Sequence, residues 1–269
     1  MPDFTQAYLR RIGLDRIPAG IEGLQLLQSM QMKAIPFENI EPLLGRIPSI
    51  ARSQVEQKTV ASGRGGYCFE LNALAGTALE EFGFQARTIL ARVRNGNPQG
   101  GARMHQAFVV EEAGRRWLFD TGFGGPGPIA PIDLDDEGPQ AFANGTYRTR
   151  FDEAAGETVL ERQQADGWFA LYGFDEDSVR AIDLDAANHL AATWPNSPFT
   201  RHLMMSRHGG GSRTTLFNRR FQGAGEARLL EGPDELRSVL VEHFGIELSP
   251  EDISALWAII EHAPTTRPG

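Results

Sequence analysis

The residue in this sequence best suited to chemistry is its single cysteine, Cys68. Two glycines and a tyrosine precede it, and it begins a run of good helix formers that extends to Phe82. A helix N-terminus has unpaired N–H groups with partial positive charge, and such a position lowers a thiol pKa from about 8.5 to roughly 3.5–7.5. The glycines let a substrate or another backbone approach closely. We expect Cys68 to be a nucleophile; a buried structural cysteine is the alternative.

A thiolate nucleophile needs a base, and the base needs an orienting group. Residues 103–120 predict a hairpin with a two-residue turn at 113–114. That turn places Ala107 opposite Asp120, and His105 lies on the same face of the sheet as Ala107. His105 and Asp120 are then diagonal neighbours whose side chains can meet, whereas a shift of one residue would separate them. The alternatives are an ordinary surface or core histidine and a turn aspartate.

The rest of the sequence predicts the elements that position these residues. Apolar residues recur at helical spacing up to residue 85, and Gly83 is a suitable C-terminal cap. Runs of β-branched and aromatic residues indicate an antiparallel sheet or barrel over 86–190. Residues 122–131 contain four glycines and three prolines and must form a loop. The end predicts a hairpin of strands 202–207 and 214–221 across glycines 209–211, followed by helices at 231–244 and 250–261.

Composition excludes several classes of partner. The formal net charge of −9 argues against nucleic acid, and no run approaches the roughly 18 apolar residues of a membrane helix. One cysteine cannot form an intramolecular disulfide, which fits a reducing compartment. The first residues lack the pattern of a signal peptide, so we expect the cytoplasm. The other histidines lack metal-site spacing, and we expect no metal.

Several segments together resemble the arylamine N-acetyltransferase family: residues 36–39, 64–68, His105 and 120–124, with weaker similarity at 187–189 and 196–199. The resemblance implies an α+β fold with a core like that of cysteine proteases. Its three parts would be a helical bundle with the nucleophile (1–85), a central antiparallel β-barrel with the histidine and aspartate (86–190), and a C-terminal α/β lid (191–269).

The same resemblance implies a reaction. Acetyl-CoA would be the co-substrate, and the acetyl group would pass by a ping-pong route to an arylamine or arylhydrazine. Cys68 would be the nucleophile, His105 the base and Asp120 the orienting acid. Four residues would lie near the substrate and CoA pocket: Phe37, Phe69, Phe123 and Gly124. Flat apolar rings suit an aromatic acceptor, although core packing is the alternative for Phe69.

Three further residues are expected to support the structure. The resemblance implies that Arg64 pairs with Glu38 and ties the first connection to the nucleophile turn, and Asn72 belongs to the same group. The residues also leave other functions open. The same three catalytic groups can serve a thioesterase or a papain-like peptidase, and an amide synthase is a close variant within the family. A binding protein that kept the fold is the third class.

Overall fold

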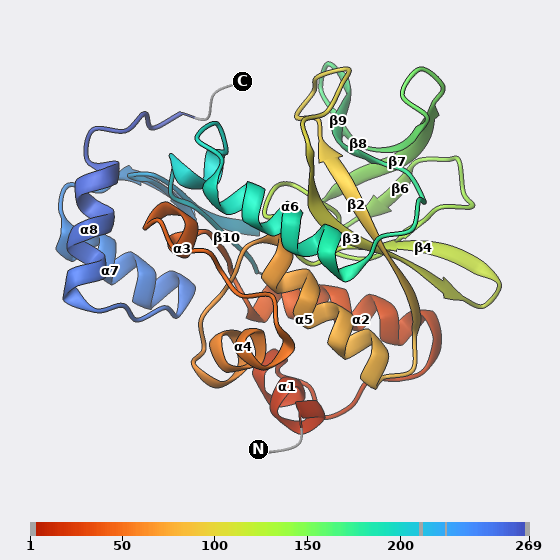
Figure 1. Ribbon diagram of the computed structural model, residues 1–269, viewed down its shortest axis with the longest axis horizontal. Coiled ribbons are helices and arrows are strands. Elements are labelled where there is room, and N and C mark those ends of the chain that lie inside the picture. The colour runs from red at the N-terminus through yellow and green to blue at the C-terminus, as the bar shows by residue number, and fades with distance from the viewer. Residues whose placement is uncertain (1–3, 210–211, 224, 267–269) are drawn as a thin grey trace.

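The computed structural model describes residues 4–209, 212–223 and 225–266 (Figure 1). The chain begins with helices, continues through a long antiparallel sheet, and ends with a smaller sheet and further helices, which confirms the expected α+β fold. The first part contains α1 (Phe4–Ile12), α2 (Gly20–Ala34), α3 (Ile40–Leu43), α4 (Arg52–Glu56), the π-helical turn η1 (Gln57–Ala61) and α5 (Cys68–Glu81). Figure 1 shows α1, α2, α4 and α5 gathered at its lower end.

Helix α5 begins at Cys68, as the sequence predicts. The preceding Tyr67 has extended backbone angles, and its N–H donates to the Glu70 side chain at 3.2 Å, which satisfies one of the donors that a helix start leaves unpaired. At the other end Gly83 has φ +80°, and the Phe84 N–H donates to the Leu79 carbonyl at 2.9 Å. This is the glycine cap expected from the sequence.

Eight antiparallel strands form a nearly closed barrel. In chain order they are β2 (Gln85–Val93), β3 (Arg103–Glu112), β4 (Arg115–Phe119), β5 (Ile132–Asp133), β6 (Gln140–Phe142), β7 (Gly145–Asp152), β8 (Glu157–Gln164) and β9 (Gly167–Phe174). Their spatial order is β5-β4-β3-β2-β9-β8-β7-β6. The Gln140 side chain of β6 exchanges two hydrogen bonds, of 2.9 and 2.8 Å, with the Asp133 backbone of β5. A side chain thus links the two edge strands.

The β3–β4 hairpin has the register that the sequence predicts. Glu112 pairs with Arg115 across a two-residue turn, in which Ala113 has φ +53° and Gly114 has φ +74°. Positive φ at both turn residues is typical of a type I′ turn, whose twist matches that of the strands. The pairing continues without a shift to Phe108 and Phe119, which leaves Asp120 at the end of β4 on the His105 side.

The second sheet has the order β1-β10-β11-β12-β13. Its strands are β1 (Phe37–Glu38), β10 (Met204–Gly209), β11 (Ser212–Phe217), β12 (Arg220–Gly223) and β13 (Glu226–Leu229), followed by α7 (Pro233–Val239), the π-helical turn η3 (Leu240–Phe244) and α8 (Pro250–Ile260). The expected hairpin is present as β10 and β11, although Gly210 and Gly211 of its tip lie outside the described residues. The single strand expected over 214–221 was wrong, because Asn218 adopts φ +50° and turns the chain back into β12.

Helix α6 (Ala181–Thr193) differs from the expectation, because the sequence predicts a sheet or barrel as far as residue 190. The segment is rich in alanine, a strong helix former, and the Asp183 carboxylate accepts the Arg180 N–H at 2.8 Å at its start. The 3₁₀ turn η2 (Pro198–Thr200) follows. In Figure 1, α6 crosses in front of β3, and the two elements are in contact. The division into three parts at residues 85 and 190 stays a proposal, since one hydrophobic core extends from Tyr8 to Ala191.

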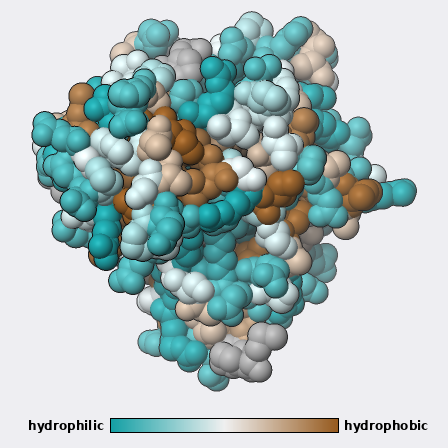
Figure 2. All heavy atoms as spheres, turned by 60° about the vertical axis from the view of Figure 1, so that its left-hand side comes forward, coloured by the Kyte–Doolittle hydropathy of each residue, from teal (hydrophilic) through white to brown (hydrophobic). Residues whose placement is uncertain are grey.

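The outer surface is mixed. Figure 2 shows a face that is mostly hydrophilic, with hydrophobic side chains collected in a few patches. Among the described residues, no helix combines the length and the apolar character needed to span a bilayer.

Candidate active site

Cys68 lies at the first turn of α5 and is 2% exposed. Its thiol approaches the Met104 carbonyl oxygen on β3, with 3.7 Å between sulfur and oxygen. Together with His105 it lines a cavity of about 270 Å³. The structure therefore brings the expected nucleophile and the expected base to the wall of one cavity.

His105 and Asp120 are hydrogen-bonded, with 2.7 Å between Nε2 of the ring and Oδ2 of the carboxylate. Both side chains are almost completely buried, at 2% and 3% exposed. The His105 ring also packs against two aromatic rings, Tyr172 at 4.9 Å and Phe123 at 5.4 Å between centroids. These contacts fix the ring plane, and Asp120 occupies Nε2, so Nδ1 remains for a reacting group.

Asp120 is itself held in place by its neighbours. Its Oδ1 accepts hydrogen bonds from Asn72 Nδ2 at 3.0 Å and from the Gly122 N–H at 2.9 Å, and its own N–H donates to the Gln28 side chain at 3.1 Å. Burial opposes ionisation of Asp120, but a positive charge on His105 and these hydrogen bonds outweigh it and lower its pKa. Asp120 is thus a fixed anion behind the histidine, and Asn72 has the supporting position expected of it.

The surroundings of the Cys68 thiol oppose its ionisation more strongly than its position at a helix N-terminus suggests. Burial raises the pKa of Cys68, and the negative charge of Asp120 raises it further. The backbone N–H groups of Phe69, Gln106 and Cys68 act in the opposite direction but do not outweigh burial. The helix N-terminus alone therefore does not produce a thiolate here. A proton transferred to His105 would do so, because it places a cation next to the sulfur and keeps the charge near Asp120 balanced.

The cavity beside the sulfur has a largely aromatic and apolar wall. Three of the four residues expected near a pocket line it: Phe37, Phe123 and Gly124. The fourth expectation was wrong: Phe69 is fully buried in the core next to Tyr67 and does not line this cavity. Its place on α5, one residue after Cys68, turns it away from the β3 side of the helix. Three further apolar residues line it: Trp194, Phe199 and Met204. Phe199 lies in the segment 196–199 that also resembles the family, whereas Trp194 and Met204 were not expected.

Glycines allow the loop after Asp120 to lie directly against the nucleophile helix. A Cβ at Gly122 would come within 2.8 Å of the Cys68 carbonyl oxygen and 2.9 Å of its Cα. Gly124 has φ +67°, and a Cβ there would overlap the Phe37 ring at 2.4 Å. These close approaches explain why the loop needs glycine at both positions.

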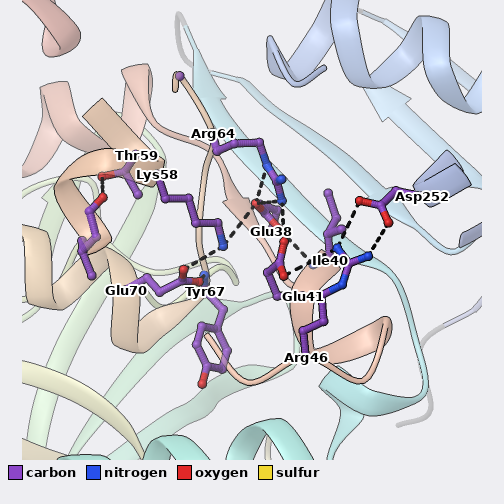
Figure 3. Close-up of polar contacts among 12 residues, drawn as sticks. Glu38, Ile40, Glu41, Arg46, Lys58, Thr59, Arg64, Tyr67, Glu70 and Asp252 are labelled. Carbon is purple, nitrogen blue, oxygen red and sulfur yellow. Dashed lines mark hydrogen bonds and ion pairs between the residues drawn. The ribbon is translucent and has the colours of Figure 1, made fainter. Parts of the chain in front are cut away.

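A buried network of charges connects the first strand to the nucleophile helix (Figure 3). The expected pair is present, with 2.8 Å between Arg64 Nη2 and Glu38 Oε1. Lys58 lies between two carboxylates, 2.7 Å from Glu70 and 3.7 Å from Glu38. Burial opposes ionisation of Glu38, but the charges of Lys58 and Arg64 and the Ile40 N–H outweigh it and lower its pKa. Since Glu70 caps α5, this network anchors the turn that presents Cys68.

Sequence reasoning missed several residues that fix this arrangement. Gln28 and Gln31 are buried on α2; Gln31 donates to Thr121 Oγ1 at 2.8 Å and to the Leu71 carbonyl at 2.9 Å. Polar residues within an otherwise buried helical stripe were the available signal.

Tyr172 was also missed. Burial and the charge of Asp120 raise its pKa, so its hydroxyl stays protonated, and its ring packs against His105.

Metal ligation has no support in this geometry. In the part of the chain that the structure describes, no group of three or more His, Cys, Asp or Glu side chains could hold a metal ion.

The chain is similar in sequence to known acetyltransferases. The profile of the N-acetyltransferase family matches residues 20–253. The chain is 33% identical over 256 residues to the arylamine N-acetyltransferase / N-hydroxyarylamine O-acetyltransferase of Salmonella typhimurium, which covers 91% of this chain and 90% of the relative. It is 35% identical over 254 residues to the arylamine N-acetyltransferase of Escherichia coli, with the same two coverages.

Solved structures give the same result. The Salmonella typhimurium arylamine N-acetyltransferase superposes with a TM-score of 0.89 and 31% identity, over 96% of this chain and 99% of that one. The Mycobacterium marinum arylamine N-acetyltransferase in complex with CoA gives a TM-score of 0.87 and 30% identity, with the same coverage. These matches confirm the resemblance inferred from the sequence, and the chain belongs to the arylamine N-acetyltransferase family.

Proposed function

We propose that this protein transfers the acetyl group of acetyl-CoA to the nitrogen of arylamines or arylhydrazines, through an acetyl-Cys68 intermediate. The observation that supports it most is the shared cavity of Cys68 and His105, with Asp120 2.7 Å behind the histidine. The relatives named as arylamine N-acetyltransferases support the acceptor class, and the Mycobacterium marinum complex supports CoA as the leaving group.

In the first half-reaction, Nδ1 of His105 accepts the thiol proton while the sulfur attacks the thioester carbonyl carbon. A new carbon–sulfur bond forms to Cys68, and the bond from that carbon to the CoA sulfur breaks. The proton on His105 then passes to the leaving thiolate. The buried Asp120 carboxylate stabilises the imidazolium that exists between these two proton transfers.

In the second half-reaction the amine nitrogen attacks the acetyl carbon and the carbon–sulfur bond to Cys68 breaks. His105 accepts the amine proton and returns it to the cysteine sulfur, so the enzyme regains its starting state. The aromatic wall that includes Phe37 and Phe123 suits a flat acceptor ring. The apolar cavity also disfavours water as an acceptor, which supports a transferase over a thioesterase.

Intact-protein mass spectrometry tests this proposal. Acetyl-CoA alone should add one acetyl group to the protein, peptide mapping should place it on Cys68, and an arylamine should remove it. Cys68→Ser should acquire no acetyl group under the same conditions. Free CoA thiol that continues to be released without amine, beyond the single turnover that acetylates Cys68, would indicate a thioesterase. An acetyl group on another residue, or turnover with no acetylated protein, would contradict the covalent route.

We also propose the cytoplasm as the location, because a single nucleophilic cysteine must stay reduced to act.

A further inference from the structure

Asn39 is the last residue of the segment 36–39 that resembles the family, and it is completely buried. It lies at the start of α3, where asparagine commonly caps a helix with its side chain. Here the side chain makes no such cap, and the Ile40 N–H instead donates to the Glu38 carboxylate at 2.9 Å. The amide group of Asn39 is therefore available for partners elsewhere in the fold.

That amide binds the chain between η2 and β10. Its Nδ2 donates to the Phe199 carbonyl at 2.9 Å and to the His202 carbonyl at 2.8 Å. Its Oδ1 accepts the Met204 N–H at 2.7 Å. An amide provides two donors and an acceptor for these three bonds, whereas a carboxylate of the same shape has no donor. The partners thus explain why the position holds asparagine rather than aspartate.

Two of these three partners, Phe199 and Met204, belong to the wall of the Cys68 cavity. They lie in a segment whose regular structure is limited to the three-residue turn η2 and the start of β10. Backbone carbonyls of such a segment need partners outside it, and the Asn39 amide binds two of them. The three hydrogen bonds therefore fix the backbone from which these two side chains reach the cavity.

Another part of the same wall lies next to Asn39 in the sequence. Phe37 lines the cavity, and its ring lies 6.1 Å from the Phe199 ring between centroids. Glu38, the residue between Phe37 and Asn39, pairs with Arg64 at 2.8 Å and anchors the nucleophile turn. Residues 37–39 thus set the spacing of the two rings relative to the nucleophile, that of Phe37 directly and that of Phe199 through the Asn39 amide.

We propose that Asn39 is a positioning residue for the acceptor, because its amide holds Phe199 and Met204 at the spacing that receives an aromatic ring. The choice of an aromatic acceptor rests on the proposed function. The clamp acts on ring binding and not on the chemistry of Cys68. Loss of its two donors therefore weakens the binding of a flat ring but leaves the thiol as reactive as before toward a small reagent.

Asn39→Asp tests this proposal, because the carboxylate can still accept the Met204 N–H but cannot bind the two carbonyls. Iodoacetamide reports on Cys68 without an aromatic ring, and acetanilide, the acetylated form of aniline, reports on ring binding by protecting the thiol. Without acetanilide, inactivation of the variant should match wild type. The acetanilide concentration for half protection should rise about tenfold, as for loss of one hydrogen bond. KM for aniline at saturating acetyl-CoA should rise by a similar factor.

Two further variants control this experiment. Asn39→Ala adds no charge and should show the same separation of ring binding from thiol reactivity. Asn218→Asp is the matched control, because Asn218 is equally buried and its amide also makes three hydrogen bonds, to Leu203, His202 and Pro264. These three residues are not among those that line the Cys68 cavity. Acetanilide should therefore protect Asn218→Asp as it protects wild type.

Equal protection of wild type and both Asn39 variants would overturn the proposal. Loss of the folded state in both variants, or thiol reactivity that changes together with protection, would assign Asn39 to general stability and reject its role in ring binding. Wild type that acetanilide does not protect would show that the wall receives no aromatic ring, which also overturns it. If wild type transferred no acetyl group to aniline, the proposed function would fail. The protection assay needs no acetyl transfer and would still decide the role of Asn39.

Discussion

His105 has two ring nitrogens, and their roles depend on a single carboxylate. Asp120 accepts a hydrogen bond from Nε2, so the neutral ring holds its proton there and leaves Nδ1 as an acceptor. The other carboxylate oxygen is already occupied by Asn72 and the Gly122 N–H. Asp120 cannot rotate without losing three contacts. The tautomer that a base requires is therefore fixed by the fold.

Asp120→Asn should keep the fold and reduce activity by roughly three to four orders of magnitude, as for loss of the orienting acid in other triads. The amide oxygen can still accept from Asn72 and Gly122, and its NH₂ group then faces His105. That group donates to Nε2, which moves the ring proton to Nδ1 and removes the base. The imidazolium also loses its counterion, so the thiolate is less stable.

The pH dependence of iodoacetamide inactivation measures this effect, because Cys68 is the only cysteine of the chain. Cys68 of the wild type should react rapidly below pH 8, because its proton passes to His105. In the variant Cys68 should behave like an ordinary buried thiol and react rapidly only at higher pH. Asp135→Asn, at an exposed carboxylate that pairs with Arg116, is the control. Coincident profiles for wild type and Asp120→Asn would show that Asp120 does not influence the thiol.

At the level of elements, sequence reasoning succeeded where local rules decide the outcome. Turn chemistry at 113–114 sets the β3–β4 register, and this register places His105 near Asp120. It failed where distant segments meet. Trp194, directly after helix α6, and Phe199 of η2 line the cavity, and their place depends on packing across the barrel rather than on any neighbouring residue. The error at Phe69 has a local cause, since one step along α5 from Cys68 turns a side chain from cavity to core.

The pair of Arg64 and Glu38 anchors the nucleophile turn, and its loss should destabilise the protein. Arg64→Ala leaves the fully buried Glu38 carboxylate with Lys58, 3.7 Å away, as its remaining ion-pair partner among the described residues. Breaking a buried pair costs about 3–5 kcal/mol, which corresponds to a fall in melting temperature of roughly 6–20 °C for a chain of this size. Lys58 favours the lower end of both ranges.

Arg46→Ala is the matched control, because Arg46 also pairs with two carboxylates but its side chain is 49% exposed. An exposed pair contributes at most about 1 kcal/mol, so its melting temperature should change by only a few degrees. Differential scanning calorimetry of both variants decides the point. A normal melt in Arg64→Ala together with lost acetyl transfer would assign Arg64 to the chemistry instead.

Over the whole molecule, buried carboxylates with opposite pKa shifts determine how stability depends on pH. Glu38 and Asp120 have lowered pKa values, so their contribution is present above the pKa of the unfolded chain, about 4, and is lost as pH falls further. Burial raises the pKa of Glu70 to about 7, although Lys58 is 2.7 Å away. The lowered pKa values reduce stability at low pH and the raised pKa of Glu70 reduces it at high pH, so the unfolding free energy has a maximum between them.

For Glu70 the folded protein binds its proton more tightly than the unfolded chain, whose glutamates titrate near about 4.3. Its contribution is therefore complete below about pH 4 and is lost as pH rises through 7. The loss is at most about 4 kcal/mol, since each pKa unit corresponds to about 1.4 kcal/mol. Together with Glu38 and Asp120, this predicts a maximum of the unfolding free energy at roughly pH 5–6.

Glu70→Gln should flatten the alkaline side of this curve. Glutamine cannot ionise, and its side-chain oxygen can still accept the Tyr67 N–H that Glu70 binds at 3.2 Å. Urea unfolding at intervals from pH 5 to 9 should show wild type losing stability across pH 7 and the variant losing much less. Glu81→Gln, at an exposed site on the same helix where the carboxylate pairs with exposed Arg52, should follow wild type. Parallel curves for wild type and Glu70→Gln would mean that the Lys58 ion pair outweighs burial and that Glu70 stays ionised in the folded protein. The anchor of the nucleophile helix would then be a permanent salt bridge rather than a group that titrates near neutral pH.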